Sequence, residues 1–240
     1  MSGTPPQPKV RVRGGSGPLQ TLVELACLRA LEALGYPLSL QVTIKREPKR
    51  DDDAGARIDE DGSLFVNLGL AKHGEPLLGW VISEEIAHHW FATQYAIRVH
   101  GEFVEVLLHE LFATWFQIRE NILTGRMSFD ELITAPVPHG PPTAALGEHL
   151  GKQIAGAALG SERNGEFLGE YLIEPGADEV VTQFTRILLD TVPFKGTPRE
   201  VGQALREIYD EIIAVQEAAG GAPAGNEEQE PARGGEQPPA

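Results

Sequence analysis

The sequence has little that would cross-link it or attach it to a membrane. One of its 240 residues is cysteine, Cys27, so an internal disulfide is excluded and we expect a reducing compartment. Cys27 falls on the apolar stripe of a predicted helix, where we expect a core residue. No basic segment followed by an apolar one opens the chain, and no apolar run approaches the ~18 residues of a membrane span. These absences predict a cytoplasmic protein.

Basic residues are scarce as well. The chain has 20 Lys and Arg against 35 Asp and Glu, which gives a formal net charge of −15 at pH 7. Nucleic acids and anionic membranes select basic surfaces, so we expect neither as a partner. The exceptions are two short clusters, both expected to be solvated faces or linkers: Lys9, Arg11 and Arg13, and Lys45, Arg46, Lys49 and Arg50.

Composition divides the chain into four parts. Residues 1–17 are rich in Pro, Gly and basic residues, and residues 220–240 contain no large apolar residue, so both segments are expected to be disordered. Residues 18–125 contain the distinctive motifs and are expected to form one domain. Residues 126–219 are predicted to be a helical C-terminal part.

The apolar pattern predicts an α+β fold. One long helix, over residues 75–97, is apolar nearly all round and is therefore expected to be buried. Alternating apolar residues indicate strands, and Asp61-Gly62 indicates a tight turn between two of them. The expected elements are a helix over residues 22–34, a strand over 38–44, a hairpin over 57–68, and helices over 75–97, 102–124, 178–191 and 198–218.

The residues suited to chemistry lie on the two long helices, in the segments SEEIAHHW (83–90) and HELFAT (109–114). Glu84 and His88 are four residues apart and share one face of the first helix. A carboxylate and an imidazole on an apolar stripe need a partner, because burying a lone charge is costly. A metal ion would satisfy both groups, and so would a hydrogen bond between them.

These segments resemble the active site of gluzincins, a class of zinc metallopeptidases. Zincins carry His-Glu-x-x-His on a helix, in which both His bind zinc and the Glu is the general base. The corresponding frame here is Glu84-Glu85-Ile86-Ala87-His88, so Glu84 replaces the first His. Gluzincins take their third ligand from Asn-Glu-x-x-Ala on a following antiparallel helix. Glu110 and Ala113 match that pattern, with His109 in place of the Asn.

The resemblance implies a zincin-like fold, a zinc cofactor and a peptide or protein substrate. It makes Glu85 the general base on a metal-bound water, His88 and Glu110 metal ligands, and Glu84 a substitute ligand. Gluzincins also place a small sheet before the active-site helix, and its edge strand pairs with extended substrate. We expect that edge strand at Leu64–Leu68.

The local likeness is to the zinc aminopeptidases among the gluzincins. Their active-site helix often continues x-Trp-Phe, as Trp90-Phe91 does here, and their second helix often ends Phe-Ala-Thr, as residues 112–114 do. Their Gly-x-Met-Glu-Asn element, which holds the free amine of a substrate, is absent from this sequence. Specificity for an amino terminus is therefore not implied.

Glu84 changes the chemistry expected of such a site. Two carboxylates and an imidazole neutralise a divalent ion and weaken its effect on the acidity of water. Carboxylate-rich ligand sets also suit iron or manganese. Three hypotheses follow: a peptide-bond hydrolase, a non-catalytic pseudopeptidase that binds peptides, and a non-hydrolytic iron or manganese enzyme.

His89 and His109 are each adjacent to a residue of the proposed site. Successive helical residues point about 100° apart, so both His are expected to lie outside the ligand set. Each could contact the ligands or the substrate, but an ordinary hydrogen-bonded polar residue is the favoured account of both. A different set, Glu85 and His89 against Glu105 and His109, resembles a carboxylate-bridged dinuclear site. Di-iron bundles use Glu-x-x-His twice, however, and that spacing occurs here once, so this arrangement ranks below the gluzincin one.

A peptidase also needs a group that stabilises the oxyanion, usually a His or Tyr from a later segment. The candidates are His149 and Tyr171. An ordinary core or surface position is the favoured explanation of both residues. The sequence does not indicate an oligomeric state.

Overall fold

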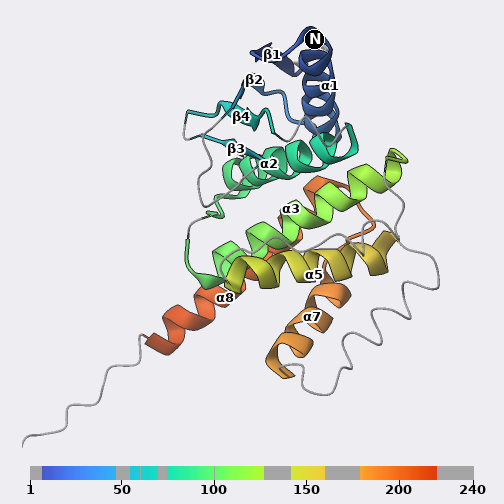
Figure 1. Ribbon diagram of the computed structural model, residues 1–240. Helices are drawn as coiled ribbons and strands as arrows, with labels where there is room; N and C mark the ends of the chain where they lie inside the picture. Colours follow the sequence, from blue (N-terminus) through green and yellow to red (C-terminus); the bar gives the residue numbers. More distant parts are fainter. Residues whose placement is uncertain are drawn as a thin grey trace, which may run out of the picture.

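The computed structural model describes residues 7–46, 55–59, 61–69, 75–99, 101–126, 142–159 and 179–220. In these ranges the protein is a mixed α+β structure, mostly helical, with four strands and six helices (Figure 1). The elements are β1 (Lys9–Arg13), α1 (Gly17–Ala33), β2 (Ser39–Lys45), β3 (Ala56–Ile58), β4 (Leu64–Asn67), α2 (Glu75–Tyr95), α3 (Phe103–Leu123), α5 (Pro142–Leu159), α7 (Glu179–Thr191) and α8 (Pro198–Gly220).

The four strands form one sheet in the order β1-β2-β4-β3. β1, β2 and β4 are parallel neighbours, whereas β3 runs antiparallel to β4. The strand predicted from alternation is confirmed: exposed and buried residues alternate along β2, and Leu40, Val42 and Ile44 point into the core. α1 and α2 pack on this inner face, which places α2 between the sheet and the remaining helices (Figure 1).

The expectation of disorder over residues 1–17 is wrong for Lys9–Arg13, which forms β1. Val10 and Val12 alternate with basic residues and pack against the core, so the segment has the period of a half-buried strand. Its Pro- and Gly-rich surroundings hid that short pattern.

The hairpin is confirmed, but the edge strand was misplaced. β3 and β4 pair through Arg57 and Phe65, and the turn closes with a 2.9 Å hydrogen bond from the Asp59 N–H to the Ser63 carbonyl. The segment expected at the edge is β4, and it lies between β2 and β3. Three consecutive buried residues explain this position, because a strand with neighbours on both sides and both faces covered is apolar throughout. β3 is therefore the edge strand beside α2.

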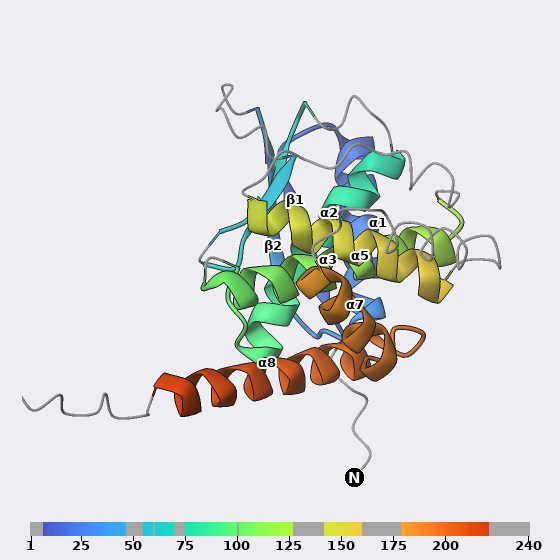
Figure 2. The same ribbon diagram turned by 90° about the horizontal axis from the view of Figure 1, so that it is seen from below.

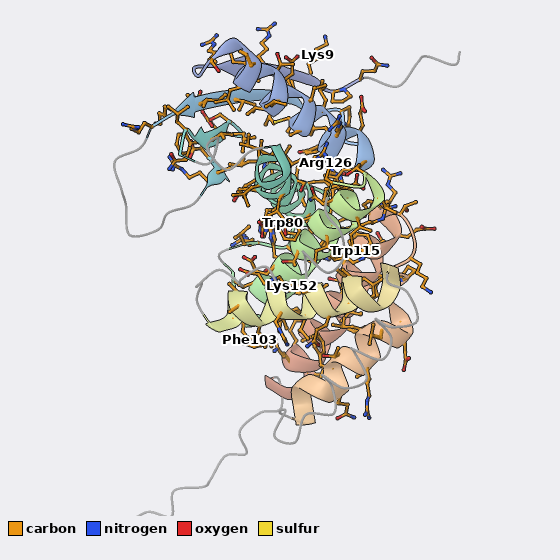
Figure 3. The ribbon with its side chains drawn as sticks, turned by 45° about the vertical axis from the view of Figure 1, so that its right-hand side comes forward. Lys9, Trp80, Phe103, Trp115, Arg126 and Lys152 are labelled. Atoms are coloured by element: carbon orange, nitrogen blue, oxygen red, sulfur yellow. The ribbon has the colours of Figure 1, made fainter. Side chains whose placement is uncertain are left out.

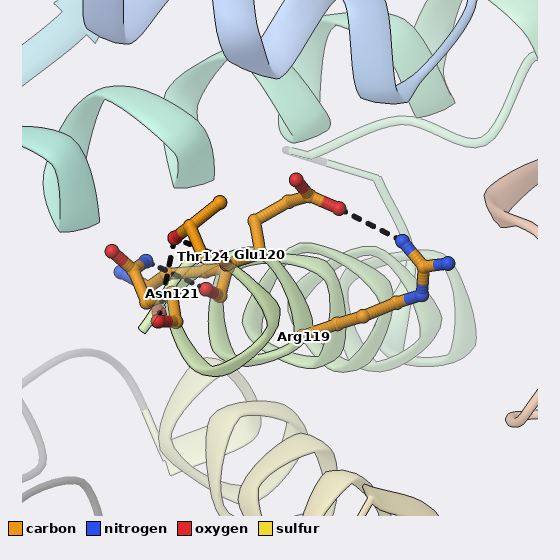
Figure 4. Close-up of polar contacts among 5 residues, drawn as sticks. Arg119, Glu120, Asn121 and Thr124 are labelled. Carbon is orange, nitrogen blue, oxygen red and sulfur yellow. Dashed lines mark hydrogen bonds and ion pairs between the residues drawn. The ribbon is translucent and has the colours of Figure 1, made fainter. Parts of the chain in front are cut away.

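The two long helices are confirmed as α2 and α3, and residues 107–118 of α3 are buried except for Glu110. Side-chain hydrogen bonds to backbone carbonyls stabilise the C-terminal end of α3. Thr124 Oγ1 donates to the Glu120 carbonyl at 2.6 Å, and Asn121 Nδ2 donates to the Gln117 carbonyl at 2.7 Å (Figure 4). Gly125 follows with a positive φ of 68°, which ends the helix as its sequence predicts.

α5 packs along α3 on the side away from the sheet (Figures 1 and 2). Two glycines permit the close approach. A Cβ on Gly147 would lie 2.6 Å from the Glu110 Cβ, and one on Gly151 would lie 2.7 Å from the Thr114 Cβ. The sequence predicted a helical C-terminal part without locating this helix, and α5 is the element that reaches Glu110.

The last two helices are confirmed within a residue or two of their predicted ends. Figure 2 shows α8 running along one side of the helical part. Two tyrosine hydroxyls hydrogen-bond α8 to the helix pair. Tyr95 of α2 donates to the Arg199 carbonyl of α8 at 2.9 Å, and Tyr209 of α8 donates to Glu105 of α3 at 2.8 Å. None of the helices in the described ranges combines the length and apolarity that crossing a bilayer requires. Residues 221–240 lie outside these ranges.

Candidate metal centre

α2 and α3 bring Glu84, His88 and Glu110 together. Each residue offers one ligand atom, and these atoms lie within 4.8 Å of one another. His88 Nε2 is 3.4 Å from Glu110 Oε2, and the two side chains are 14% and 13% exposed. Two atoms bound to one zinc ion, each about 2 Å from it, lie about 3–4 Å apart. The group is therefore close to the spacing that a shared ion requires, and it remains accessible from solvent.

Glu84 is oriented by a residue that sequence reasoning missed. Gln117 of α3 donates from Nε2 to Glu84 Oε2 at 2.8 Å and to the Trp80 carbonyl at 3.2 Å. Gln117 is itself buried, so its amide is fixed between α2 and α3. Its position seven residues after Glu110 places both side chains on one face of α3, a regularity that could have identified it.

His109 contacts His88 on the nitrogen that faces away from Glu110. The two Nδ1 atoms are 2.6 Å apart, and the rings stack with their centroids 4.8 Å apart. One of the two nitrogens must donate and the other must accept. If the lone pair of His88 Nε2 binds an ion, the ring proton of His88 is on Nδ1. That N–H then donates a hydrogen bond to His109 Nδ1. His109 thus lies beside a ligand and outside the ligand group, as helical geometry predicts.

The carboxyl groups of this region have raised pKa values. Burial and then the charge of Glu148 raise the pKa of Glu84 to about 7. Burial and the charge of Glu84 raise the pKa values of Glu85 and Glu110 to about 8. Lys152 on α5 opposes the shift at Glu84. So many acidic groups in one partly buried place cost folding free energy, and a bound cation would offset that cost.

Glu85 lies between the ligand group and the edge strand. The backbone N–H of Ile58 on β3 hydrogen-bonds its carboxylate, and the charges of Glu84 and Glu110 both act on it. Glu85 is not one of the three converging residues. Glu85 is adjacent to Glu84 on α2, so its side chain points in a different direction, toward β3, and lies beside the three converging residues.

The structure does not assemble the alternative dinuclear set. The ring of His89 lies 6.1 Å from the ring of Tyr36, and burial lowers the His89 pKa. Glu105 closes the capping box of α3 by accepting from the Glu102 N–H at 3.2 Å, and it also binds Tyr209. His89 faces Tyr36 and Glu105 faces Tyr209 of α8, and among the described residues the four members of this set do not converge, so the dinuclear arrangement is wrong.

Of the two candidates for stabilising an oxyanion, only His149 lies in the described residues. His149 lies on α5 with its Nε2 2.6 Å from Gln153 Nε2, one turn further along the same helix. Tyr171 lies outside the described residues. Two residues missed in the sequence, Glu148 and Lys152, do act on Glu84 electrostatically. They are four residues apart on α5, directly after the glycines that bring this helix close to α3.

No protein-family model, curated protein or solved structure matches this chain. The interpretation of the site therefore depends on its own geometry and on the likeness of its two helical motifs to gluzincins.

Proposed function

We propose that the protein is a gluzincin-like, metal-dependent hydrolase of peptide bonds, with a zincin-like fold. Glu84, His88 and Glu110 would hold a divalent ion, with zinc as the first expectation. The observation that carries the proposal is the convergence of these side chains from α2 and α3 within 4.8 Å. The sheet precedes the helix pair along the chain, as the resemblance implies.

The donor set fits a divalent cation. Glu84 and Glu110 have pKa values of about 7 and 8, so a cation would displace protons that they hold near neutral pH. His88 already points Nε2 at Glu110. When bound, a divalent ion would polarise a carbonyl group and make water more acidic.

Glu85 is the proposed general base. Its pKa of about 8 suits both accepting a proton from an attacking water and returning it to the leaving amine near neutral pH. The hydrogen bond from the Ile58 N–H fixes its carboxylate against β3. Mobility of the base would lower the fraction of productive encounters, so this support favours the assigned role.

The edge strand supports a peptide substrate. The hydrogen bonds Asp59 N–H to Ser63 and Asn67 N–H to Gly55, both 2.9 Å, use one side of β3. Ala56 and Ile58 therefore turn their backbone groups to the other side, where Ile58 meets Glu85. An extended peptide that pairs with the outward backbone groups of Ala56, beside the Ile58 N–H that Glu85 occupies, would place a backbone carbonyl next to the proposed base.

The first test is metal analysis of the purified protein by mass spectrometry. We expect near-stoichiometric zinc in the wild type, none in His88→Ala or Glu110→Ala, and unchanged zinc in the matched control His89→Ala. Iron or manganese that is lost in the same two variants would favour the non-hydrolytic iron or manganese enzyme over the zinc hydrolase. Absence of metal even after incubation with zinc would contradict every metal-dependent function.

The second test separates metal binding from catalysis. Glu85→Gln should retain zinc and lose at least about 100-fold of the cleavage rate on an unfolded protein such as casein. Equal cleavage by Glu85→Gln and the wild type would contradict the role of Glu85.

A non-catalytic peptide-binding protein is the second candidate, and one observation favours it. Gln117 and His109 already give Glu84 and His88 polar partners, so both side chains are satisfied by protein groups. This candidate predicts no bound metal and no effect of zinc on thermal stability. The metal analysis above therefore distinguishes it from the hydrolase.

A further inference from the structure

The sheet brings together basic residues that are far apart in the sequence. Residues paired across neighbouring strands point to the same face, and the register joins Arg13 to Thr43, Thr43 to Phe65, and Phe65 to Arg57. The outer face opposite α1 and α2 consists of Lys9, Arg11 and Arg13 of β1, Ser39, Gln41, Thr43 and Lys45 of β2, Arg57 of β3, and Phe65 and Asn67 of β4.

Half of these ten outward positions are Lys or Arg, and none is acidic, in a chain where acidic residues outnumber basic ones by 35 to 20. Every outward residue of β1 and β2 is exposed. Arg57 pairs with Asp59 at 3.0 Å, just beyond the end of β3. The set Lys9, Arg11, Arg13, Lys45 and Arg57 is called the basic sheet face below. Figure 3 shows Lys9 at the end of the molecule remote from α7.

Aromatic and polar side chains complete this surface. The Phe65 ring is buried beneath two cations, with Arg57 Cζ 4.5 Å and Lys45 Nζ 5.1 Å from its centroid. These contacts hold both side chains over the sheet. Gln41 and Thr43 of β2 lie between the cations of β1 and Arg57 of β3, where they can hydrogen-bond to the backbone of a bound segment.

We propose that the basic sheet face is a docking site for a short acidic segment of a partner protein. Along β1 the cations span about 13 Å, and three strand spacings across the sheet span about 14 Å. Like charges held this close repel one another, and carboxylates placed between them would remove that repulsion. The face therefore fits a few Asp or Glu side chains on an extended or turned segment.

Charge also decides between partner classes. A nucleic acid duplex carries one charge per about 1.7 Å and would extend past this small face onto the rest of a chain whose net charge is −15. A short acidic peptide segment ends its charge within the face and avoids that repulsion. The observations thus favour an acidic polypeptide. Arg57 points to the outer face and Ile58, the next residue of β3, lies beside Glu85 on the inner side, so the sheet would separate the docked segment from the candidate metal centre.

The test is fluorescence anisotropy with the full chain and a fluorescein-labelled peptide of alternating Glu and Ser residues. The double variant Arg11→Glu, Arg13→Glu should bind at least about tenfold more weakly than the wild type. The matched control Arg186→Glu, Lys195→Glu changes two exposed cations on and after α7 and should bind within about twofold of the wild type. Raising salt from about 0.05 M to about 0.5 M should abolish the difference.

Further variants and a second probe separate charge from folding and a polypeptide from a nucleic acid. The neutral variant Arg11→Ser, Arg13→Ser should show an intermediate loss of peptide affinity with an unchanged circular dichroism spectrum, which separates lost charge from lost folding.

Equal weakening of peptide binding by the sheet-face variant and the control would overturn the site. Tighter binding of an oligonucleotide of equal charge, through the same residues, would overturn the acidic-polypeptide assignment. No binding by the wild type would leave the cations only the role of protecting an exposed edge strand. The metal-site variant His88→Ala should bind the peptide normally, so this inference and the proposed function can fail separately.

Discussion

The interface between α2 and α3 contains two neighbouring regions of opposite character. In the first, Phe112 stacks on Phe91 with ring centroids 4.4 Å apart, and Trp115 packs beside it at 5.8 Å. In the second, Glu84 and Glu110 share a partly buried space, where both raise the pKa of Glu85 and Glu84 also raises the pKa of Glu110. The same two helices thus supply both a close-packed aromatic core and a cluster of acidic groups.

The difference between these regions separates stability from function. Aromatic burial contributes to folding in any conditions, because it depends on apolar area removed from water. Gathered carboxyl groups reduce stability until a cation or a proton neutralises them. A protein that keeps such groups next to its best-packed core is expected to use them. The aromatic region then supplies the rigidity that the acidic region needs for a fixed ligand geometry.

The largest expected effect comes from breaking the aromatic region. Phe112→Ala removes a fully buried ring and leaves a cavity, so it should lower the free energy of unfolding by about 3–5 kcal/mol. Urea denaturation followed by circular dichroism measures this. The control Phe103→Ala alters a ring that is 58% exposed and should change stability by less than about 0.5 kcal/mol. Equal effects of the two changes would contradict the packing described for α3.

The next effect comes from filling the acidic region. Zinc that binds only the folded protein should stabilise it by about 2.7 kcal/mol at a free concentration 100 times Kd. Thermal unfolding with and without zinc measures the gain, and His88→Ala should show none. A similar shift in the wild type and in His88→Ala would mean that zinc acts elsewhere on the chain.

A smaller effect comes from neutralising one acid in the metal-free protein. The pKa of Glu84 is about 7 in the folded state against an ordinary value of 4.5. The folded state therefore retains its proton longer, and the wild type loses stability as pH rises from about 4.5 to about 7. Glu84→Gln removes that loss while its amide oxygen still accepts from Gln117. The variant should be more stable than the wild type by about 1–2 kcal/mol at pH 8 and equally stable near pH 4. A variant less stable than the wild type at pH 8 would show that the structure favours the charged Glu84.

Sequence periodicity predicts most of this fold because single segments determine it. α1, β2, the hairpin, α2 and α3 each carry a local pattern, and the structure confirms each one. β1 and the order of strands differ, since strand neighbours depend on partners distant in the sequence. The glycines that seat α5 on α3 show the same limit, because a close approach is visible only once both helices are placed.

The candidate site divides in the same way. The helical spacing of Glu84 and His88 predicts their shared face, and an antiparallel second helix predicts Glu110 beside them. Gln117 orients Glu84, and Glu148 and Lys152 of α5 shift its pKa in opposite directions; neither effect follows from the motif. The basic sheet face could not be predicted either, because its two halves are short clusters until β1 and β2 pair.

The last and smallest expected effect concerns His109, which lies at the boundary between the aromatic and the acidic regions. His109 Nδ1 is 2.6 Å from His88 Nδ1, so it can hold His88 in the tautomer that leaves Nε2 available for an ion. His109→Leu keeps the site apolar but removes the acceptor, and we expect zinc affinity to fall about tenfold in competition with a chelator. His109→Asn restores an amide acceptor at the same position and should retain most of the affinity. If both variants bind zinc equally well, His109 belongs to the aromatic core, which it also touches through Phe91 at 5.6 Å, and has no part in positioning the ligand.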